Sequence, residues 1–169
     1  MKKDYSRIPE SAADPKGSGS GGPVRFTLAG ATGPTPPRAD SPSHHRVLLV
    51  EDQPDVARAT AMGLEHLGAE VCIAGTGAAA LEQSLAFRPT LVLLDIDLPD
   101  INGHEVGRRL RQMPALDAVP LVALTSWNTP EMRQRSADAG MVEHLAKPLD
   151  LDALAALLAR IPVHSWQGQ

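Results

Sequence analysis

Apolar and polar residues alternate in blocks along residues 46–161, and this pattern predicts a regular succession of strands and helices. The apolar runs that we expect to form strands are 46–50, 70–74, 90–95, 119–124 and 142–145. The runs that we expect to form helices are 54–67, 77–87, 103–112, 129–139 and 150–160. Because strands that alternate with helices of about 10–15 residues build βαβ units, the pattern predicts an α/β fold around a parallel sheet.

Residues that start and stop helices agree with these limits. Pro54 suits the first turn of a helix, and Gly68 suits the left-handed position that follows one. Asp150 precedes the last amphipathic run and is typical of a helix N-cap.

The third apolar run, 91–94, contains no polar residue and ends in Asp95. A strand without polar alternation is typical of a central parallel strand that is buried on both faces. The first run, 46–50, ends in the acidic pair Glu51 and Asp52. Because parallel strands present functional groups at their carboxyl ends, we expect the three carboxylates to meet at one edge of the sheet. Three anions at close range need a cation, so the sequence predicts a divalent metal site around Asp95.

The ends of the fourth and fifth predicted strands supply groups of other kinds. Thr125 offers a hydroxyl and Lys147 an ammonium that would face the carboxylates. A lysine is a compact point charge that suits a phosphoryl oxygen, and Mg²⁺ prefers oxygen ligands. Carboxylates also accept phosphoryl groups covalently. The set therefore predicts a phosphoryl-binding site with Asp95 as the acceptor.

Composition limits the other functions that the chain could have. A net charge of −4 does not favour a nucleic-acid or membrane surface as the main partner. No apolar run approaches the roughly 18 residues that a membrane span needs, and no secretory signal follows Lys2 and Lys3. The single cysteine, Cys72, cannot form an internal disulfide, which indicates a reducing compartment. We therefore expect a cytoplasmic protein.

The two ends of the chain differ from its centre. Residues 1–45 are rich in Pro, Gly and Ser and are predicted to be a flexible linker, while 162–169 form a short tail. Residues 23–29 alternate like a half-buried strand and resemble the last strand of a histidine-kinase ATPase domain. On that hypothesis the chain is the end of a hybrid kinase, but we favour a linker with an apolar patch. His44 and His45 fall in this segment without metal-ligand spacing to a third group.

These motifs together make residues 46–161 resemble the receiver domain of two-component response regulators. The resemblance rests on Glu51-Asp52, on Asp95 with Leu98-Pro99 and Gly103 after it, on Thr125 and on Lys147-Pro148. It implies a flavodoxin-like, doubly wound (βα)5 fold whose five parallel strands have the order 2-1-3-4-5.

The resemblance implies that Asp95 becomes an aspartyl-phosphate and that the site binds Mg²⁺ (or Mn²⁺). Asp52, Asp95 and the backbone carbonyl of Asp97 would be metal ligands, and Glu51 would act through a metal-bound water. Glu51 stands where the family often has Asp, and we expect metal binding to be preserved.

The resemblance also implies a switch. Lys147 would pair first with Asp95 and then with the phosphoryl group, and the Lys147–Pro148 peptide bond would be cis. The Thr125 hydroxyl would move onto the phosphoryl group. His144 stands where the family often has Tyr or Phe, so it could change rotamer and add pH sensitivity near neutrality. An exposed loop histidine is the alternative.

Three residues near the acceptor are expected to modulate the chemistry: Asp97, Ser126 and Trp127. Trp127 would lie beside the path of the water that hydrolyses the phosphoryl group, and we expect its bulk to slow this reaction. The alternative is an indole that folds over the surface.

The phosphoryl donor would be a phospho-histidine on a sensor histidine kinase or a histidine phosphotransfer protein. The residues that we expect to contact this partner are Asp55, Val56, Ala59, Met62, Gly63 and Pro148. The stripe of Val56, Ala59 and Met62 has an alternative role, packing on the sheet. Output would pass to an effector or a homodimer through the fourth helix, fifth strand and fifth helix.

Two further functions compete with a phospho-switch. Asp95-Ile96-Asp97 matches the start of haloacid-dehalogenase-like phosphatases, but there the other metal acids follow this motif, whereas here the acidic pair precedes it. A docking module that is never phosphorylated usually lacks the acceptor or an acid, and both are present. We therefore predict a switch that catalyses only its own phosphorylation and dephosphorylation, either as a stand-alone regulator or as the receiver of a hybrid kinase.

Overall fold

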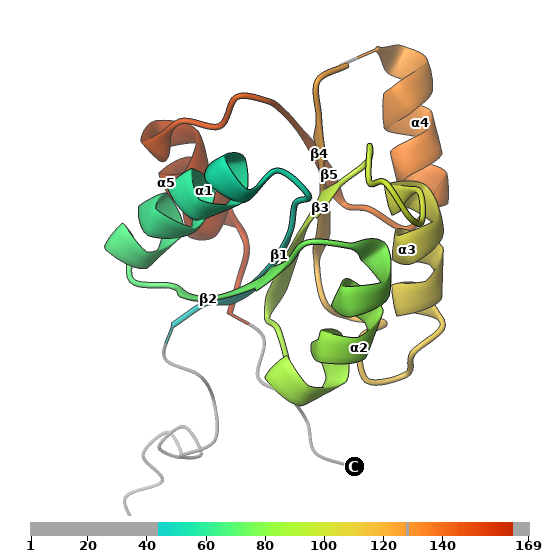
Figure 1. Cartoon of the computed structure of the whole chain (residues 1–169), viewed down its shortest axis with the longest axis horizontal. Helices are drawn as coiled ribbons and strands as arrows, with labels where there is room; N and C mark the ends of the chain where they lie inside the picture. Colours follow the sequence, from blue (N-terminus) through green and yellow to red (C-terminus); the bar gives the residue numbers. More distant parts are fainter. Residues whose placement is uncertain (1–43, 128, 164–169) are drawn as a thin grey trace, which may run out of the picture. The chain divides into compact units, whose positions relative to one another are not determined.

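The computed structural model describes residues 44–127 and 129–163, where strands and helices alternate as predicted (Figure 1). The strands are β1 (Arg46–Val50), β2 (Glu70–Ala74), β3 (Leu91–Asp95), β4 (Leu121–Thr125) and β5 (Glu143–Ala146). The helices are α1 (Pro54–His66), α2 (Gly77–Phe87), α3 (Gly103–Arg111), α4 (Pro130–Asp138) and α5 (Leu151–Arg160). The predicted strand at 23–29, most of the predicted linker and the end of the tail lie outside the described residues.

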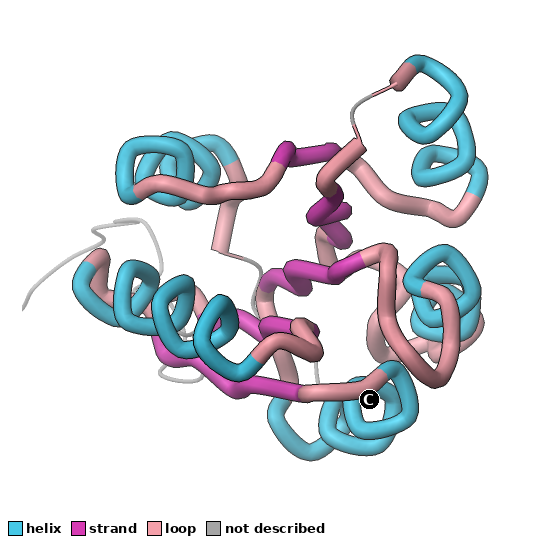
Figure 2. Tube along the Cα trace, turned by 45° about the horizontal axis from the view of Figure 1, so that its top comes forward, coloured by secondary structure: helices cyan, strands magenta, loops and turns pink. Residues whose placement is uncertain are grey.

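All strand pairs are parallel, and the strand order β2-β1-β3-β4-β5 confirms the predicted fold class. Helices α1 and α5 cover one face of the sheet, and α2, α3 and α4 cover the other (Figures 1 and 2). β3 lies in the middle, and every one of its residues is buried. The prediction of a central strand that is buried on both faces is therefore confirmed.

Alternate residues of the central strands fill two cores. Leu48 and Leu94 face a cluster that includes residues of α2 and α3. Leu49 and Leu93 face the opposite cluster, which α1 and α5 complete. This period of two follows from the pleat, which points successive side chains to opposite faces. Residues of β1 and β3 pack in both cores, so the backbone positions at the carboxyl ends of these two strands are fixed.

The signals for helix ends have the expected geometry. Pro54 occupies the first turn of α1, and Gly68 has a φ of 87° just beyond it. The Asp150 carboxylate accepts a hydrogen bond from the amide of Ala153, 2.7 Å away, and caps α5. Thr129 caps α4 through the amide of Met132, which is why α4 begins one residue later than predicted.

Some limits differ from the predicted ones. The predicted strand at 119–124 begins instead at Leu121, because the amide of Val119 closes a turn onto the carbonyl of Leu116. His45 precedes the first strand, and its side chain is buried, with Nε2 3.1 Å from the carbonyl oxygen of Leu158. Among the described residues, none of the helices combines the length and apolarity that crossing a bilayer would need.

Candidate phosphoryl and metal site

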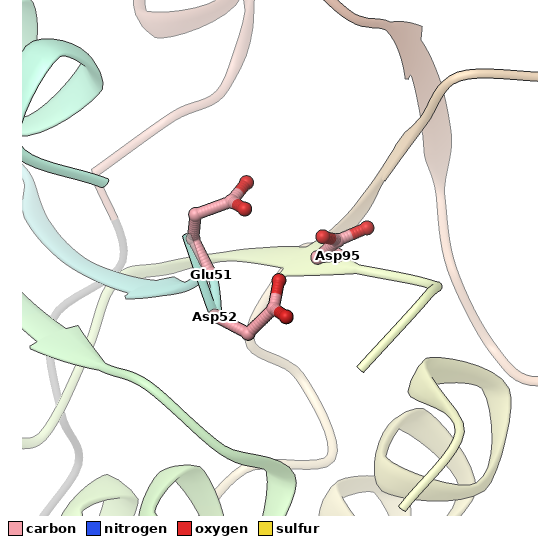
Figure 3. A group of neighbouring side chains, drawn as sticks. All are labelled: Glu51, Asp52 and Asp95. Atoms are coloured by element: carbon pink, nitrogen blue, oxygen red, sulfur yellow. The ribbon is translucent and has the colours of Figure 1, made fainter. Parts of the chain in front are cut away.

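Three carboxylates meet at the carboxyl edge of the sheet (Figure 3). Glu51 and Asp52 follow β1, and Asp95 is the last residue of β3. Each of the three offers an oxygen within 4.8 Å of the others. Glu51 and Asp95 are buried, while Asp52 is partly exposed. The sequence prediction that these side chains converge agrees with their positions in the structure.

The register of the sheet explains this convergence. Val50 pairs with Leu94, so the next residues, Glu51 and Asp95, leave neighbouring strands side by side. The amide of Glu51 donates to the carbonyl of Ala74, which extends the β1–β2 ladder to this residue. Because β1 and β3 are buried, their carboxyl ends cannot shift without disturbing the core.

Lys147 reaches into this acidic cluster from beyond β5. Its ammonium donates to Asp95 Oδ2, 2.7 Å away, and to Glu51 Oε2. Burial on its own lowers the pKa of Lys147, but the hydrogen bonds to Asp95 and Glu51 outweigh that effect and raise it. Lys147 is therefore protonated at neutral pH. The following peptide bond, Lys147–Pro148, is cis, as predicted.

The charges of this cluster do not balance. Three carboxylates lie together, and within residues 44–127 and 129–163 Lys147 forms ion pairs with Glu51 and Asp95 but not with Asp52. The loop after β3 adds backbone to the same corner, since the amide of Asp97 donates to Asp95 Oδ1 at 3.1 Å. Hard oxygen donors with an excess of negative charge are what Mg²⁺ requires. The donor set therefore fits such an ion.

Thr125 ends β4 on the other side of Asp95. Its side chain is buried, and its hydroxyl lies 3.1 Å from the amide and 3.2 Å from the carbonyl of Trp127. These hydrogen bonds turn the hydroxyl towards its own loop. Ser126 and Trp127 are exposed, and 66% of the Trp127 surface faces solvent.

His144 lies on β5, not in a loop, and it is only partly exposed. Both of its ring nitrogens are buried, and neither has a hydrogen-bond partner among the described residues. Burial lowers its pKa, and the Trp127 backbone, although outside hydrogen-bond geometry, partly offsets this effect. The neutral ring is thus the favoured form.

A groove of about 1040 Å³ runs beside the acidic cluster, between α1 and the start of α5. All six residues that we expect to contact a partner line it: Asp55, Val56, Ala59, Met62, Gly63 and Pro148. Val56 and Met62 are exposed, so the alternative in which this stripe packs on the sheet is wrong. The packing face of α1 consists of other residues: Ala57, Thr60, Ala61 and Leu64.

Sequence reasoning missed two features of this region. His66 lines the groove, and its spacing of four residues from Met62 continues the exposed stripe on α1. Glu51 is a direct partner of Lys147, which strand-end reasoning alone does not show.

The sequence matches a family model and several known proteins, and these matches agree on one family. A family model described as response regulator receiver domain matches residues 47–159. The aerobic respiration control sensor protein ArcB of Escherichia coli K12 is 45% identical over 127 residues, which cover 73% of this chain and 15% of that protein. The response regulator ArlR of Staphylococcus saprophyticus is 33% identical over 66% of this chain and 49% of its own length. The chain thus spans less than half the length of either relative.

Solved structures agree with this similarity. The chemotaxis protein CheY4 of Vibrio cholerae superposes with a TM-score of 0.69 at 26% identity, covering 71% of this chain and all of that one. The receiver domain of the sensor histidine kinase PA1611 of Pseudomonas aeruginosa superposes with a TM-score of 0.65 at 30% identity, covering 70% and 98%. That structure is described as having a magnesium ion coordinated in its active-site cleft.

Proposed function

Since the chain belongs to the response regulator receiver family, we propose that Asp95 accepts a phosphoryl group from a phospho-histidine donor. Two-component phospho-switches of this kind are not enzymes in the ordinary sense. The observation that carries the proposal is the contact of 2.7 Å between Lys147 Nζ and Asp95 Oδ2, inside a cluster of acidic oxygens. The burial of this carboxylate beside a cation supports its proposed role as the acceptor.

The proposed site holds Mg²⁺ (or Mn²⁺) through Asp52, Asp95 and the backbone carbonyl of Asp97, with Glu51 acting through a bound water. The bound ion would supply positive charge to the oxygens of the transferring phosphoryl group. The magnesium described for the PA1611 receiver domain supports this assignment.

The residues of the chain position and neutralise the transferred group. A carboxylate oxygen of Asp95 attacks phosphorus in line, a P–O bond forms, and the P–N bond to the donor histidine breaks. The Lys147 ammonium moves from Asp95 to a phosphoryl oxygen, where its charge is needed. The Thr125 hydroxyl leaves the Trp127 backbone and donates to the same group.

The proposed donor is a sensor histidine kinase or a histidine phosphotransfer protein, docked on the groove beside α1. Val56 and Met62 are exposed in this groove, and Lys147 lines the same groove. This combination suits a helix that carries a phospho-histidine. After phosphorylation, Thr125 and His144 would change the α4–β5–α5 surface, which would bind an effector or a second copy of the chain. The domain would serve as a stand-alone regulator or as part of a hybrid kinase, and the match to a small part of the sensor protein ArcB supports the second.

The first experiment is phosphorylation by acetyl phosphate with and without Mg²⁺, read by intact mass. We expect one added phosphoryl group that needs Mg²⁺ and is absent from Asp95→Asn. Absence of the adduct even with a cognate phospho-donor would support a docking module that is never phosphorylated. Multiple turnover of p-nitrophenyl phosphate would support the phosphatase instead, and we expect negligible turnover.

A further inference from the structure

The first turn of α2 needs hydrogen-bond acceptors that its own residues do not fully provide. The first amides of any helix lack partners within the helix. Thr76 caps one of them, since its Oγ1 lies 3.1 Å from the amide of Ala79. Its carbonyl, 3.0 Å from the amide of Ala80, accepts the first hydrogen bond of the helix itself. The amides of Gly77 and Ala78 are left for an acceptor from elsewhere in the chain.

Asp100 supplies both acceptors from the loop between β3 and α3. Its Oδ1 accepts from the amide of Gly77 and its Oδ2 from the amide of Ala78, each at 2.9 Å. The hydrogen bonds from Ala78 and Gly77 lower the pKa of the Asp100 carboxyl, so it is ionised at neutral pH. This two-pronged contact joins segments that lie more than twenty residues apart in the chain.

The loop that carries Asp100 is the same loop that borders the acceptor. At the start of this loop the amide of Asp97 donates to the Asp95 carboxylate. At its end the amide of Gly103 donates to the carbonyl of Ile96, 3.0 Å away. Between these points Asp97, Pro99 and Asp100 are exposed. The carboxylate of Asp100 therefore fixes the exposed turn of the loop against α2.

We propose that Asp100 is a positioning residue for the phosphoryl site. By tying the β3–α3 loop to the first turn of α2, it holds the backbone of Asp97 at the edge of the acidic cluster. This inference rests on the proposed function, since Asp97 matters there as a source of a ligand carbonyl. Residues that orient metal ligands commonly change metal affinity by about 10-fold or more when they are replaced.

The test compares Asp100→Ala with Thr76→Ala. Both variants remove hydrogen-bond acceptors from the start of α2, but only Asp100→Ala releases the loop. The first measurement is hydrogen–deuterium exchange of the metal-free proteins, and the second is Mg²⁺ titration followed by amide chemical shifts. Asp100→Asn, which keeps one acceptor oxygen, serves as the conservative variant.

We expect faster exchange at residues 96–103 in Asp100→Ala and a dissociation constant for Mg²⁺ that rises about 10-fold. Thr76→Ala should lower the melting temperature but leave both quantities unchanged, and Asp100→Asn should fall between Asp100→Ala and the natural chain. Equal values for the two alanine variants would make Asp100 a helix cap only, which overturns the inference. A natural chain that binds no Mg²⁺ would instead overturn the proposed function itself.

Discussion

The two loops on either side of Asp95 are held in contrasting ways. The β3–α3 loop is tied to α2 by Asp100, and α3 then buries five of its nine residues. On the other side, the Thr125 hydroxyl is bonded to the Trp127 backbone, and α4, also nine residues long, buries only Ser136. Regions with few buried contacts open at low cost. The difference indicates that one side of the site, the fixed side, is held by more buried contacts than the other, the responsive side.

Two histidines lie where these sides meet. His104 of α3 is buried, with Nδ1 3.1 Å from Asn102 Oδ1 and Nε2 3.2 Å from the Ser136 hydroxyl of α4. His144 of β5 has two buried ring nitrogens that find no such partner in the part of the chain that the structure describes. The well-bonded histidine thus belongs to the fixed side and the poorly bonded one to the responsive side.

The largest expected effect comes from Gly103→Ala on the fixed side. A Cβ at residue 103 would lie 2.2 Å from the carbonyl oxygen of Asp95 and 2.7 Å from Cα of Ile96, and both are backbone atoms that cannot rotate away. We expect the free energy of unfolding in urea to fall by about 3 kcal/mol. Gly75→Ala is the control, because a Cβ there meets no atom of the described residues within 4 Å and should change stability by less than about 1 kcal/mol. Equal losses in the two variants would mean that the start of α3 is not tightly fitted.

Mg²⁺ provides the second test of the fixed side. If Glu51, Asp52 and Asp95 already lie in place, binding needs little rearrangement, and stability should follow simple one-site linkage. At a concentration 100-fold above the dissociation constant, the free energy of unfolding should rise by about 2.7 kcal/mol. Asp95→Asn should lose most of this increase. An equal increase in both proteins would show that the ion binds elsewhere.

Some of the features behind these predictions could be predicted from the sequence, and others could not. Glu51, Asp52 and Asp95 were predictable because each follows a buried apolar run, and parallel strands bring such positions to one edge. The strand order followed from the family resemblance and is confirmed. The contact of Asp100 with α2 was not predictable, since it depends on how two loops that are remote in the chain approach each other.

Side-chain orientation was the other limit. Periodicity shows that Val56 and Met62 share a face of α1, but not whether that face packs on the sheet. In the structure the small residues Ala57 and Ala61 are the ones buried on the packing face of α1. Equally, the position of His144 was predictable, but not that its ring nitrogens are buried and lack hydrogen-bond partners within residues 44–127 and 129–163.

Acidification should destabilise the protein through His104 of the fixed side and His144 of the responsive side. Burial lowers the pKa of both His104 and His144, and nearby arginines lower them further. The stability that the neutral rings provide is therefore present above the unfolded pKa of about 6.5 and is lost as the pH falls below it. The slope can reach about 1.4 kcal/mol per pH unit for each group. Urea unfolding between pH 7.5 and pH 5.5 (roughly one unit either side of that value) measures the loss, and His144→Phe should reduce the slope. An unchanged slope would assign the effect to other groups.

At pH 8, where both rings are neutral, the two histidines should respond oppositely to replacement. His144→Phe removes two buried nitrogens that have no hydrogen-bond partner among the described residues, and it should stabilise the protein by about 1 kcal/mol. His104→Phe breaks the contacts with Asn102 and Ser136 and should destabilise it by a similar amount. Both values come from urea unfolding. A loss in both variants would show that the surroundings of His144 are packed as specifically as those of His104.

Trp127→Ala should have the smallest effect on stability, because 66% of this residue is exposed. We expect a change within about 0.5 kcal/mol. The Thr125 hydroxyl is held by the backbone of Trp127, which alanine keeps, so the substitution removes the indole alone. If that indole hinders the water that attacks the aspartyl-phosphate, the phosphoryl group should be lost several-fold faster, measured by intact mass after removal of the donor.

The control for Trp127→Ala is Leu85→Ala, an exposed apolar residue on α2, which should leave the phosphoryl lifetime unchanged. An unchanged lifetime in Trp127→Ala as well would mean that the indole only covers the surface. The lifetime would then be set by the fixed side of the site, and Asp97, on the loop that Asp100 holds, would be the next residue to replace. A shorter lifetime would instead show that the responsive side controls how long the switch stays on, even though it contributes little to the stability of the fold.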